Sequence, residues 1–313
     1  MLDGLAHVPK VEARAALLSL GLSVTLVGVK FAAYFLTGSA AIFSDAVENV
    51  VNVLAASFAL YALNLAHTPP DEDHPYGHGK IEFLSASFEG GLIVLAGLVI
   101  LYKAVANLVT GNVEVESLGW GVALTAAAMA ANGVVGWYLI RLGRRRTSAT
   151  LEADGHHLLS DTITSAGALI ALAIVHFTGF APADPIGAML MAGYMLYLGS
   201  ALLRKAGGGL MDRQDAEDHR IITSVLDAHL GLAGKEPRVC SYHKLRHRHS
   251  GRYHWVDFHL VLPPDVGLET AHNVASAIEH EIQSAIGEGN ATAHTEPCRD
   301  SSCELCQAHP DVA

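Results

Sequence analysis

Residues 162–183 have the sequence TITSAGALIALAIVHFTGFAPA, which contains no Asp, Glu, Lys or Arg. A helix needs ~20 apolar residues to cross the ~30 Å hydrocarbon core of a bilayer. This stretch is long enough, and it lacks the charged face that a helix on the surface of a soluble protein carries. It therefore predicts a membrane-spanning helix.

Five further apolar segments of similar length occur before and after it. The sequence predicts six spans, near residues 14–37, 40–65, 81–107, 118–140, 150–178 and 184–206. The alternative is a soluble protein with buried helices. Six such lengths in succession without a polar face argue against that alternative.

Composition changes near Gly209. Residues 1–208 contain 26 charged residues, whereas residues 209–313 contain 25 in about half the length, together with 11 of the 18 histidines. The net charge is -11, and this acidic balance argues against nucleic acid as a partner, because a phosphate-binding surface needs clustered Lys and Arg. We therefore predict a membrane domain at 1–208, a soluble domain at 209–297 and a Cys-containing tail at 298–313.

The soluble segment alternates between helical and strand patterns. In order, these are a helix at 215–230, strands at 238–246 and 253–262 joined at Ser250-Gly251, a helix at 267–286 and a short strand near 290–296. This α-β-β-α-β order predicts a small α+β domain with a ferredoxin-like sheet and two covering helices.

Basic residues predict the orientation in the membrane. They lie before the first span, between the fourth and fifth spans, and after the sixth, at Lys10, Arg14, Arg141, Arg144, Arg145, Arg146, Arg204 and Lys205. Because cytoplasmic loops carry an excess of Lys and Arg, we expect both termini in the cytoplasm.

Two of the predicted spans carry a polar stripe. Ionisable groups inside a bilayer are costly and often mark ion pathways. The helical spacings i, i+3, i+4 and i+7 put the members of each stripe on one face: Asp45, Glu48, Asn49 and Asn52 in one span, and Asp154, His157 and Asp161 in the other. Together the stripes could supply four ligands to Zn²⁺, Fe²⁺ or Mn²⁺. Alternatively, they hold helices together through hydrogen bonds.

The span near 81–107 contains two glutamates. Glu82 lies close to the predicted cytoplasmic end, and we expect it to reach water. Glu89 lies deeper, as either a proton-carrying group or a helix contact. Before this span, the loop 69–80 reads PPDEDHPYGHGK, and its Asp71, His74 and His78 form either a compact set of metal ligands or a solvated polar loop.

The C-terminal segment contains Cys298-x4-Cys303-x2-Cys306, followed by His309. This spacing is typical of metal ligands, although a polar terminus can equally be disordered. A reducing cytoplasm disfavours disulfides there. Three other histidines, His247, His249 and His254, are expected to form a solvated surface.

Two motifs carry a family resemblance. The run HPYGHGKIE at 74–82 is similar to the HxxGHGKxE signature of the cation diffusion facilitators, and His157-x-x-x-Asp161 is similar to their HxxxD motif. The ending His294-Thr295-Glu296-Pro297-Cys298 resembles their bacterial iron/zinc efflux branch. The chain, from about residue 12 to 298, thus resembles a family of membrane antiporters that export divalent metal ions against protons.

The resemblance implies three ligand sets and one ion pair. The transport site falls on Glu48, Asn52, His157 and Asp161, with Asp45 and Asn49 as an alternative register. A membrane-edge site falls on Asp71, His74 and His78, and a cytoplasmic site on His243, His259, His272, His294 and Glu296. Lys80 and Asp212 match a charge pair that links the membrane and cytoplasmic parts across the dimer.

The resemblance also implies a function. We expect a homodimer in the inner membrane that exchanges cytoplasmic metal for protons, with His157 and Asp161 in the proton step and no enzymatic activity. Zn²⁺ is the foremost substrate, with Fe²⁺, Mn²⁺, Co²⁺ and Cd²⁺ also compatible. One alternative is a membrane metal sensor that does not transport. An intramembrane metalloprotease would need an HExxH pair, which this sequence lacks.

Overall fold

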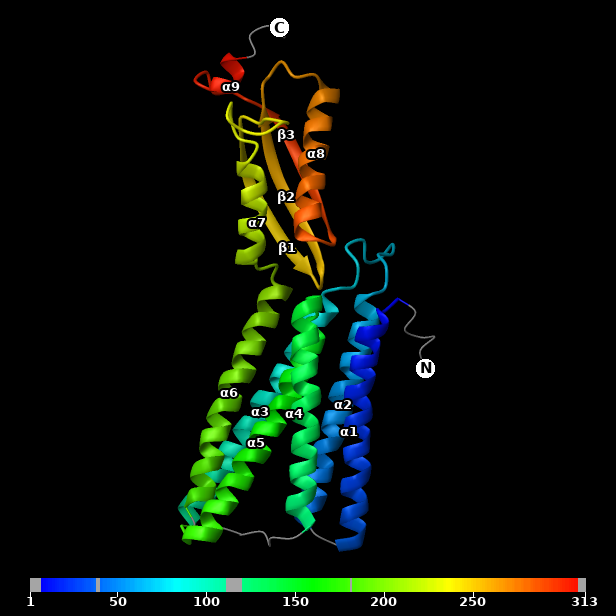
Figure 1. Ribbon diagram of the computed structural model, residues 1–313, viewed down its shortest axis with the longest axis vertical. Coiled ribbons are helices and arrows are strands. Elements are labelled where there is room, and N and C mark those ends of the chain that lie inside the picture. The colour runs from blue at the N-terminus through cyan, green and yellow to red at the C-terminus, as the bar shows by residue number, and fades with distance from the viewer. Residues whose placement is uncertain (1–6, 38–39, 111–119, 181, 309–313) are drawn as a thin grey trace. The chain divides into compact units, whose positions relative to one another are not determined.

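The computed structural model of the protein describes residues 7–37, 40–110, 120–180 and 182–308 (Figure 1). The chain divides into two compact units, Met1–Leu210 and Met211–Ala313. Within the described residues, the first unit consists of long helices and the second combines a three-stranded sheet with shorter helices. The predicted fold class is confirmed.

Six long helices correspond to the six predicted spans. They are α1 (Lys10–Thr37), α2 (Ala40–Ala66), α3 (Ile81–Thr110), α4 (Trp120–Arg146), α5 (Ala149–Thr178) and α6 (Ala183–Leu210). Each contains a segment that is long and apolar enough to cross a membrane.

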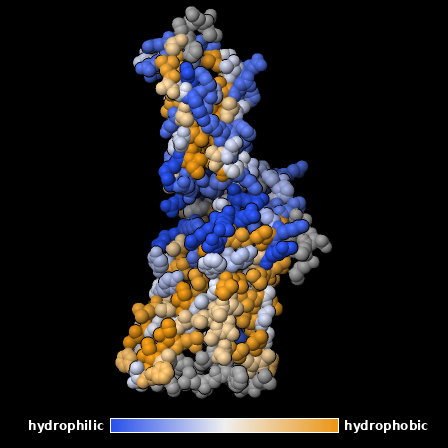
Figure 2. Space-filling view, in the orientation of Figure 1, coloured by the Kyte–Doolittle hydropathy of each residue, from blue (hydrophilic) through white to orange (hydrophobic). Residues whose placement is uncertain are grey.

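Large apolar side chains lie on the outside of this helical unit. Tyr102, Val109 and Phe177 are 76%, 81% and 83% exposed, and Figure 2 shows hydrophobic residues over much of the visible helical surface. In water an apolar surface of this extent would be a liability, whereas lipid tails solvate it. The helical unit is therefore the membrane domain of a multi-pass protein.

The helices of the membrane domain pack closely in pairs: α1 with α2, α3 with α6, and α4 with α5. Glycine makes the α4–α5 contact possible, because a Cβ atom on Gly155 would lie only 2.7 Å from the carbonyl oxygen of Gly136. Since lipid offers no hydrophobic drive for helix association, small residues that let backbones approach are a common solution. This contact positions α5, which carries one of the predicted polar stripes.

The N-terminus of α5 is capped from α3. The hydroxyl of Ser148 donates to Oε2 of Glu82 over 2.5 Å, and the same carboxylate oxygen accepts from the backbone N–H of Thr150 at 3.2 Å. Glu82 is only 1% exposed, so the expectation that it reaches water is wrong. The first N–H groups of a helix need acceptors and favour a negative charge, and Glu82 meets both needs.

The second unit follows the predicted α-β-β-α-β order. Its elements are α7 (Ala216–Asp227), β1 (Ser241–Ser250), β2 (Tyr253–Leu262), α8 (Leu268–Ile286), β3 (Gly289–Pro297) and a short α9 (Glu304–Gln307). The sheet order is β1-β2-β3, with β1 antiparallel and β3 parallel to the central β2.

The core of this unit lies between one face of the sheet and the helices α7 and α8. Alternate residues of β2 are buried, among them Phe258 and Leu260, and they pack with Leu226 of α7 and Ile278 of α8. Because successive strand residues point to opposite faces, the residues between them, such as His259, face away from this core.

Candidate metal sites

Three predicted transport-site residues meet between α2 and α5. The side-chain amide nitrogen Nδ2 of Asn52 donates to Oδ2 of Asp161 over 2.8 Å, and Nε2 of His157 lies 3.0 Å from Oδ1 of Asn52. Because an amide oxygen can only accept, this contact makes Nε2 of His157 the donor. The amide of Asn52 therefore bridges the imidazole and the carboxylate.

Glu89 of α3 lies against this cluster. Its Oε2 is 3.9 Å from Nδ1 of His157, and its side chain is fully buried. Among the described residues, neither carboxylate oxygen of Glu89 has a hydrogen-bond partner. Three helices thus contribute polar groups to one buried region of the membrane domain.

The other members of the two stripes are placed only in part. Asn49 and Asp154 are buried, with 5% and 2% exposure. The side chains of Asp45 and Glu48 lie outside the described residues, so the choice between Glu48 with Asn52 and Asp45 with Asn49 stays a prediction. The contacts of Asn52 with His157 and Asp161 favour the first register.

The three predicted ligands of the loop between α2 and α3 lie together. Asp71 accepts from the backbone N–H of His74 at 2.6 Å, and its carboxylate oxygens lie 3.1 Å from Nδ1 of His74 and 3.3 Å from Nε2 of His78. The backbone hydrogen bond from His74 holds the pKa of Asp71 below its usual range. Ligand atoms of all three residues lie within 4.8 Å of one another, which suits a small cation.

The sheet of the second unit aligns three predicted histidines. His243 pairs with His259 across β1 and β2, and His259 pairs with His294 across β2 and β3. Their ring centroids are 5.1 Å and 4.7 Å apart along this row. Cross-strand neighbours share a face, so strand register alone gathers the imidazoles.

Glu296, two residues after His294, reaches this row. Its carboxylate oxygens lie 2.7 Å from Nδ1 of His259, 3.3 Å from Nε2 of His243 and 3.8 Å from Nε2 of His294. The hydrogen bond with His259 holds the pKa of Glu296 below its usual range. The fifth predicted ligand, His272, lies on an exposed position of α8, and its part in this site stays a prediction for the dimer.

The predicted charge pair involves residues of different units. Within the second unit, Asp212 accepts from Nη1 of Arg248 at 3.1 Å. Lys80 belongs to the first unit, so its pairing with Asp212 stays a prediction.

The structure contains one cluster of histidine and carboxylate side chains that the sequence pattern does not predict. Asp218 of α7 lies 2.7 Å from Nε2 of His249 and 3.1 Å from Nδ1 of His254, while His247 is only 5% exposed. Burial alone would raise the pKa of Asp218, but the two histidines outweigh it and hold that pKa well below its usual range. The expectation of a solvated histidine surface is therefore wrong. His249 and His254 flank the β1–β2 turn, but no sequence signal connects them to Asp218.

Histidine and carboxylate side chains lie together both in the membrane domain and in the second unit. Such groups are typical ligands of divalent metal ions. Two family models match the chain: the cation efflux transmembrane domain over residues 16–211, and the cytoplasmic domain of cation efflux proteins over residues 217–298. The chain belongs to the cation diffusion facilitator family.

Several relatives share this architecture along most of their length. An uncharacterized transporter of Synechocystis is 36% identical over 95% of this chain and 93% of its own. The cation-efflux pump FieF of Shewanella oneidensis is 29% identical over 89% and 92%, and the magnetosome protein MamB of Magnetospirillum gryphiswaldense is 28% identical over 80% and 82%.

Membership of the cation diffusion facilitators makes the chain a cation efflux transporter with a cytoplasmic domain, in a family that is not a class of enzymes. The family transports metal ions, and the clusters described above are candidate ligand groups for such ions.

Proposed function

We propose that this protein exports divalent metal ions from the cytoplasm in exchange for protons, as a homodimer in the inner membrane. Zn²⁺ is the proposed principal substrate, with Fe²⁺, Mn²⁺, Co²⁺ or Cd²⁺ as others. The observation that carries the proposal is the bridge His157–Asn52–Asp161, beside the buried Glu89. Basic residues at the ends of α4 and α6 favour a cytoplasmic location for both termini.

The bridge pairs the polar groups of the proposed site with one another. His157 donates from Nε2 to Asn52, and Asn52 donates to Asp161, so these polar groups compensate one another in a region of low dielectric. A metal ion needs a lone pair on the imidazole and a deprotonated carboxylate. Binding through Nε2 of His157 therefore displaces the proton from that nitrogen.

Glu89 lies beside Nδ1, the ring nitrogen of His157 that does not bind the metal in this proposal. If the ring starts protonated on both nitrogens, metal binding at Nε2 releases that proton and leaves the other on Nδ1, which lies 3.9 Å from Oε2 of Glu89. Histidines that bind metals commonly donate their other ring N–H to a carboxylate, which fixes the ring and raises its basicity. We therefore assign Glu89 as a positioning residue for His157, and Glu48, Asn52, His157 and Asp161 as the ligands.

Exchange follows from competition between metal and protons for the same groups. Metal binding releases protons, and protonation of His157 and Asp161 on the outward side releases the metal. Coupling requires two conformations with opposite preference for the two ligands, and rocking of helix pairs around a central site provides them.

Reconstituted transport tests this proposal. We expect the purified protein in proteoliposomes to take up Zn²⁺ when a proton gradient is imposed, and to release protons in a Zn²⁺-dependent manner. Parallel assays with Fe²⁺, Mn²⁺, Co²⁺ and Cd²⁺ rank the substrates. Metal binding without flux would instead support the non-transporting sensor, and flux that ignores the proton gradient would contradict exchange.

Glu89→Ala should weaken metal binding at the transport site by about 10–100-fold, because loss of the carboxylate partner of a metal-bound histidine has effects of that size. Glu89→Gln should recover part of the loss, since its amide oxygen still accepts a hydrogen bond. The assay compares the KM for Zn²⁺, kcat and the pH profile of flux. Ser87→Ala, on the same helix, is the matched control, because the hydroxyl of Ser87 donates to the backbone carbonyl of Phe83 within α3. Equal pH profiles in all variants would contradict this role.

We further propose that the cytoplasmic domain senses metal through His243, His259, His294 and Glu296, with His272 contributing in the dimer. The family model for this domain is named for a dimer, which supports the homodimer. A cation shared by these groups would hold the domain in the geometry that favours transport.

The double variant His259→Ala/His294→Ala should raise the Zn²⁺ concentration needed for half-maximal flux while leaving measurable transport, because the membrane ligands are intact. Flux titrations in proteoliposomes measure this shift. His280→Ala, an exposed histidine of α8, should behave as the wild type. An unchanged titration would remove the sensing role, and failure of the double variant to fold would indicate a structural role.

A further inference from the structure

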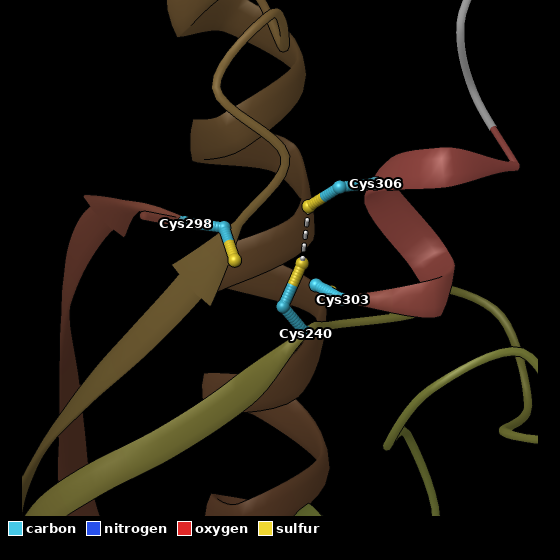
Figure 3. Close-up of side chains that lie close together, drawn as sticks. All are labelled: Cys240, Cys298, Cys303 and Cys306. Atoms are coloured by element: carbon cyan, nitrogen blue, oxygen red, sulfur yellow. Dashed lines mark hydrogen bonds between the residues drawn. The ribbon is translucent and has the colours of Figure 1, made fainter. Parts of the chain in front are cut away.

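All four cysteines of the protein lie in one cluster of the cytoplasmic domain. Ligand atoms of Cys240, Cys298, Cys303 and Cys306 lie within 4.8 Å of one another, and the sulfurs of Cys240 and Cys306 are 3.4 Å apart (Figure 3). Cys240 precedes β1, Cys298 follows β3, and the other two belong to the short segment around α9. The sequence motif suggested His309 beside the last three, but His309 lies outside the described residues.

Strand pairing explains why Cys240 joins cysteines that lie 58 to 66 positions later in the chain. The backbone N–H of Cys240 donates to the carbonyl of Val261 at 2.8 Å, and that of Cys298 donates to the carbonyl of Leu262 at 2.7 Å. Both cysteines therefore flank the end of β2, because β1 begins and β3 ends at the same edge of the sheet.

A tight turn brings the remaining two cysteines back to this edge. The carboxylate of Asp300 accepts from the backbone N–H of Ser302 at 2.8 Å, and the N–H of Cys303 donates to the carbonyl of Asp300 at 3.2 Å. Cys303 then occupies the position before α9, and Cys306 follows within it. The turn and the helix aim both sulfurs at Cys240.

The geometry suits a tetrahedral ion better than a disulfide. Four sulfurs bound at ~2.3 Å to a tetrahedral Zn²⁺ lie about 3.8 Å from one another, close to the spacing of this cluster. A disulfide would need sulfurs ~2.05 Å apart, and all four cysteines are free. A cytoplasmic domain is also in a reducing compartment, which keeps thiols available to metals.

The segment that carries Cys303 and Cys306 has little else to hold it. In residues 299–308, Leu305 is the one buried side chain, and α9 spans four residues. Helices this short are not stable by themselves. A metal ion bound to both the sheet and the tail would supply the missing attachment.

We propose that Cys240, Cys298, Cys303 and Cys306 form a tetrathiolate Zn²⁺ site that fastens the C-terminal segment to the sheet of the cytoplasmic domain. Four protein ligands leave no open coordination position, which is typical of structural rather than catalytic or transit sites. The bound ion would be a resident one, distinct from transported cargo. It would also fix the ends of β1 and β3, which carry His243 and Glu296.

Cobalt substitution of the full-length protein tests the site. We expect the purified, reduced protein to bind Co²⁺ with a sulfur-to-cobalt charge-transfer band and the strong visible absorption of tetrahedral Co²⁺. Cys303→Ser/Cys306→Ser should lose the charge-transfer band and one equivalent of bound Zn²⁺ per chain. The control variant His259→Ala removes a histidine of the sheet cluster and should keep the band, because only thiolates produce it.

A second pair of variants tests whether the fourth ligand is Cys240, as the structure indicates, or His309, as the sequence motif suggested. Cys240→Ser should lose the charge-transfer band or weaken Co²⁺ binding at least about tenfold, since one of four ligands is lost. His309→Ala should leave both unchanged. If His309→Ala has this effect and Cys240→Ser does not, the fourth ligand is His309 and not Cys240. A charge-transfer band that no Cys→Ser change affects would overturn the proposed site.

Alkylation of the wild-type protein tests the site without depending on whether the variants fold. With Zn²⁺ present, all four cysteines should resist a thiol reagent, and chelation should make them react together. Independent labelling of each cysteine, whether or not metal is present, would overturn the proposal. These readouts measure binding and not flux, so they stand or fall separately from the proposed transport.

Discussion

Asp161→Asn should reduce metal flux by more than about 100-fold, because even the loss of an outer-shell partner of a metal site reduces affinity about 10–100-fold. The substitution replaces the carboxylate of a proposed ligand with a neutral amide, in a membrane region where charge is weakly screened. It preserves size and still lets Asn52 donate to an oxygen at this position, so the packing of α2 against α5 should survive. The loss should therefore reside in binding and not in folding.

Zn²⁺ flux into proteoliposomes and calorimetric Zn²⁺ titration of the same preparation measure this effect. The matched control is Asp257→Asn, the same chemical change at an exposed position of β2, which should transport as the wild type does. Flux and affinity near wild-type values in Asp161→Asn would remove Asp161 from the transport site. A fully active protein would also leave the bridge through Asn52 as a helix contact only.

Gly155→Ala should destabilise the membrane domain by about 1–3 kcal/mol, the usual range for overpacking a tight contact. The added Cβ would lie 2.7 Å from the carbonyl oxygen of Gly136 and 2.7 Å from the backbone nitrogen of Ile140. Backbone atoms cannot rotate away as side chains can, so α4 and α5 must separate. Because α5 also carries His157 and Asp161, transport should fall together with stability.

Thermal unfolding of detergent-solubilised protein, followed by size-exclusion chromatography, measures the change. Gly193→Ala on α6 is the matched control, since a Cβ there meets no atom within 4 Å. We expect a melting temperature several degrees lower for Gly155→Ala and an unchanged one for the control. Equal melting temperatures would show that α4 and α5 tolerate separation at this contact.

The local sequence pattern predicts the wrong environment for residues whose partners are distant in the chain. Glu82 was expected in water because it lies at the end of a span, yet it caps α5 through Ser148 and Thr150, more than 60 positions away. His249 and His254 were expected on a solvated surface, yet both contact Asp218. In each case the local sequence pattern indicates an exposed side chain, whereas a helix packed against that side chain covers it.

Other site residues could be predicted because their spacing is local. Asp71, His74 and His78 lie in one short loop, and His157 and Asp161 are one helical turn apart, so their proximity follows from backbone geometry. The contact of His157 and Asp161 with Asn52 depends on which helices pair, and residue spacing does not predict that. The structure brings α2 and α5 together and adds Glu89 from α3, whose role the sequence had left open.

The local sequence pattern is enough to predict the six membrane helices, the order of elements in the cytoplasmic domain and the candidate ligands within single elements. Hydrophobic length and residue spacing are local properties, and a chain of this composition has few other ways to satisfy its backbone in lipid. In contrast, packing and strand pairing are needed to place Cys240 with the other cysteines and Glu89 beside His157. Those proximities depend on strand register and helix packing, which arise from many contacts between distant segments and leave no periodic signal in the chain.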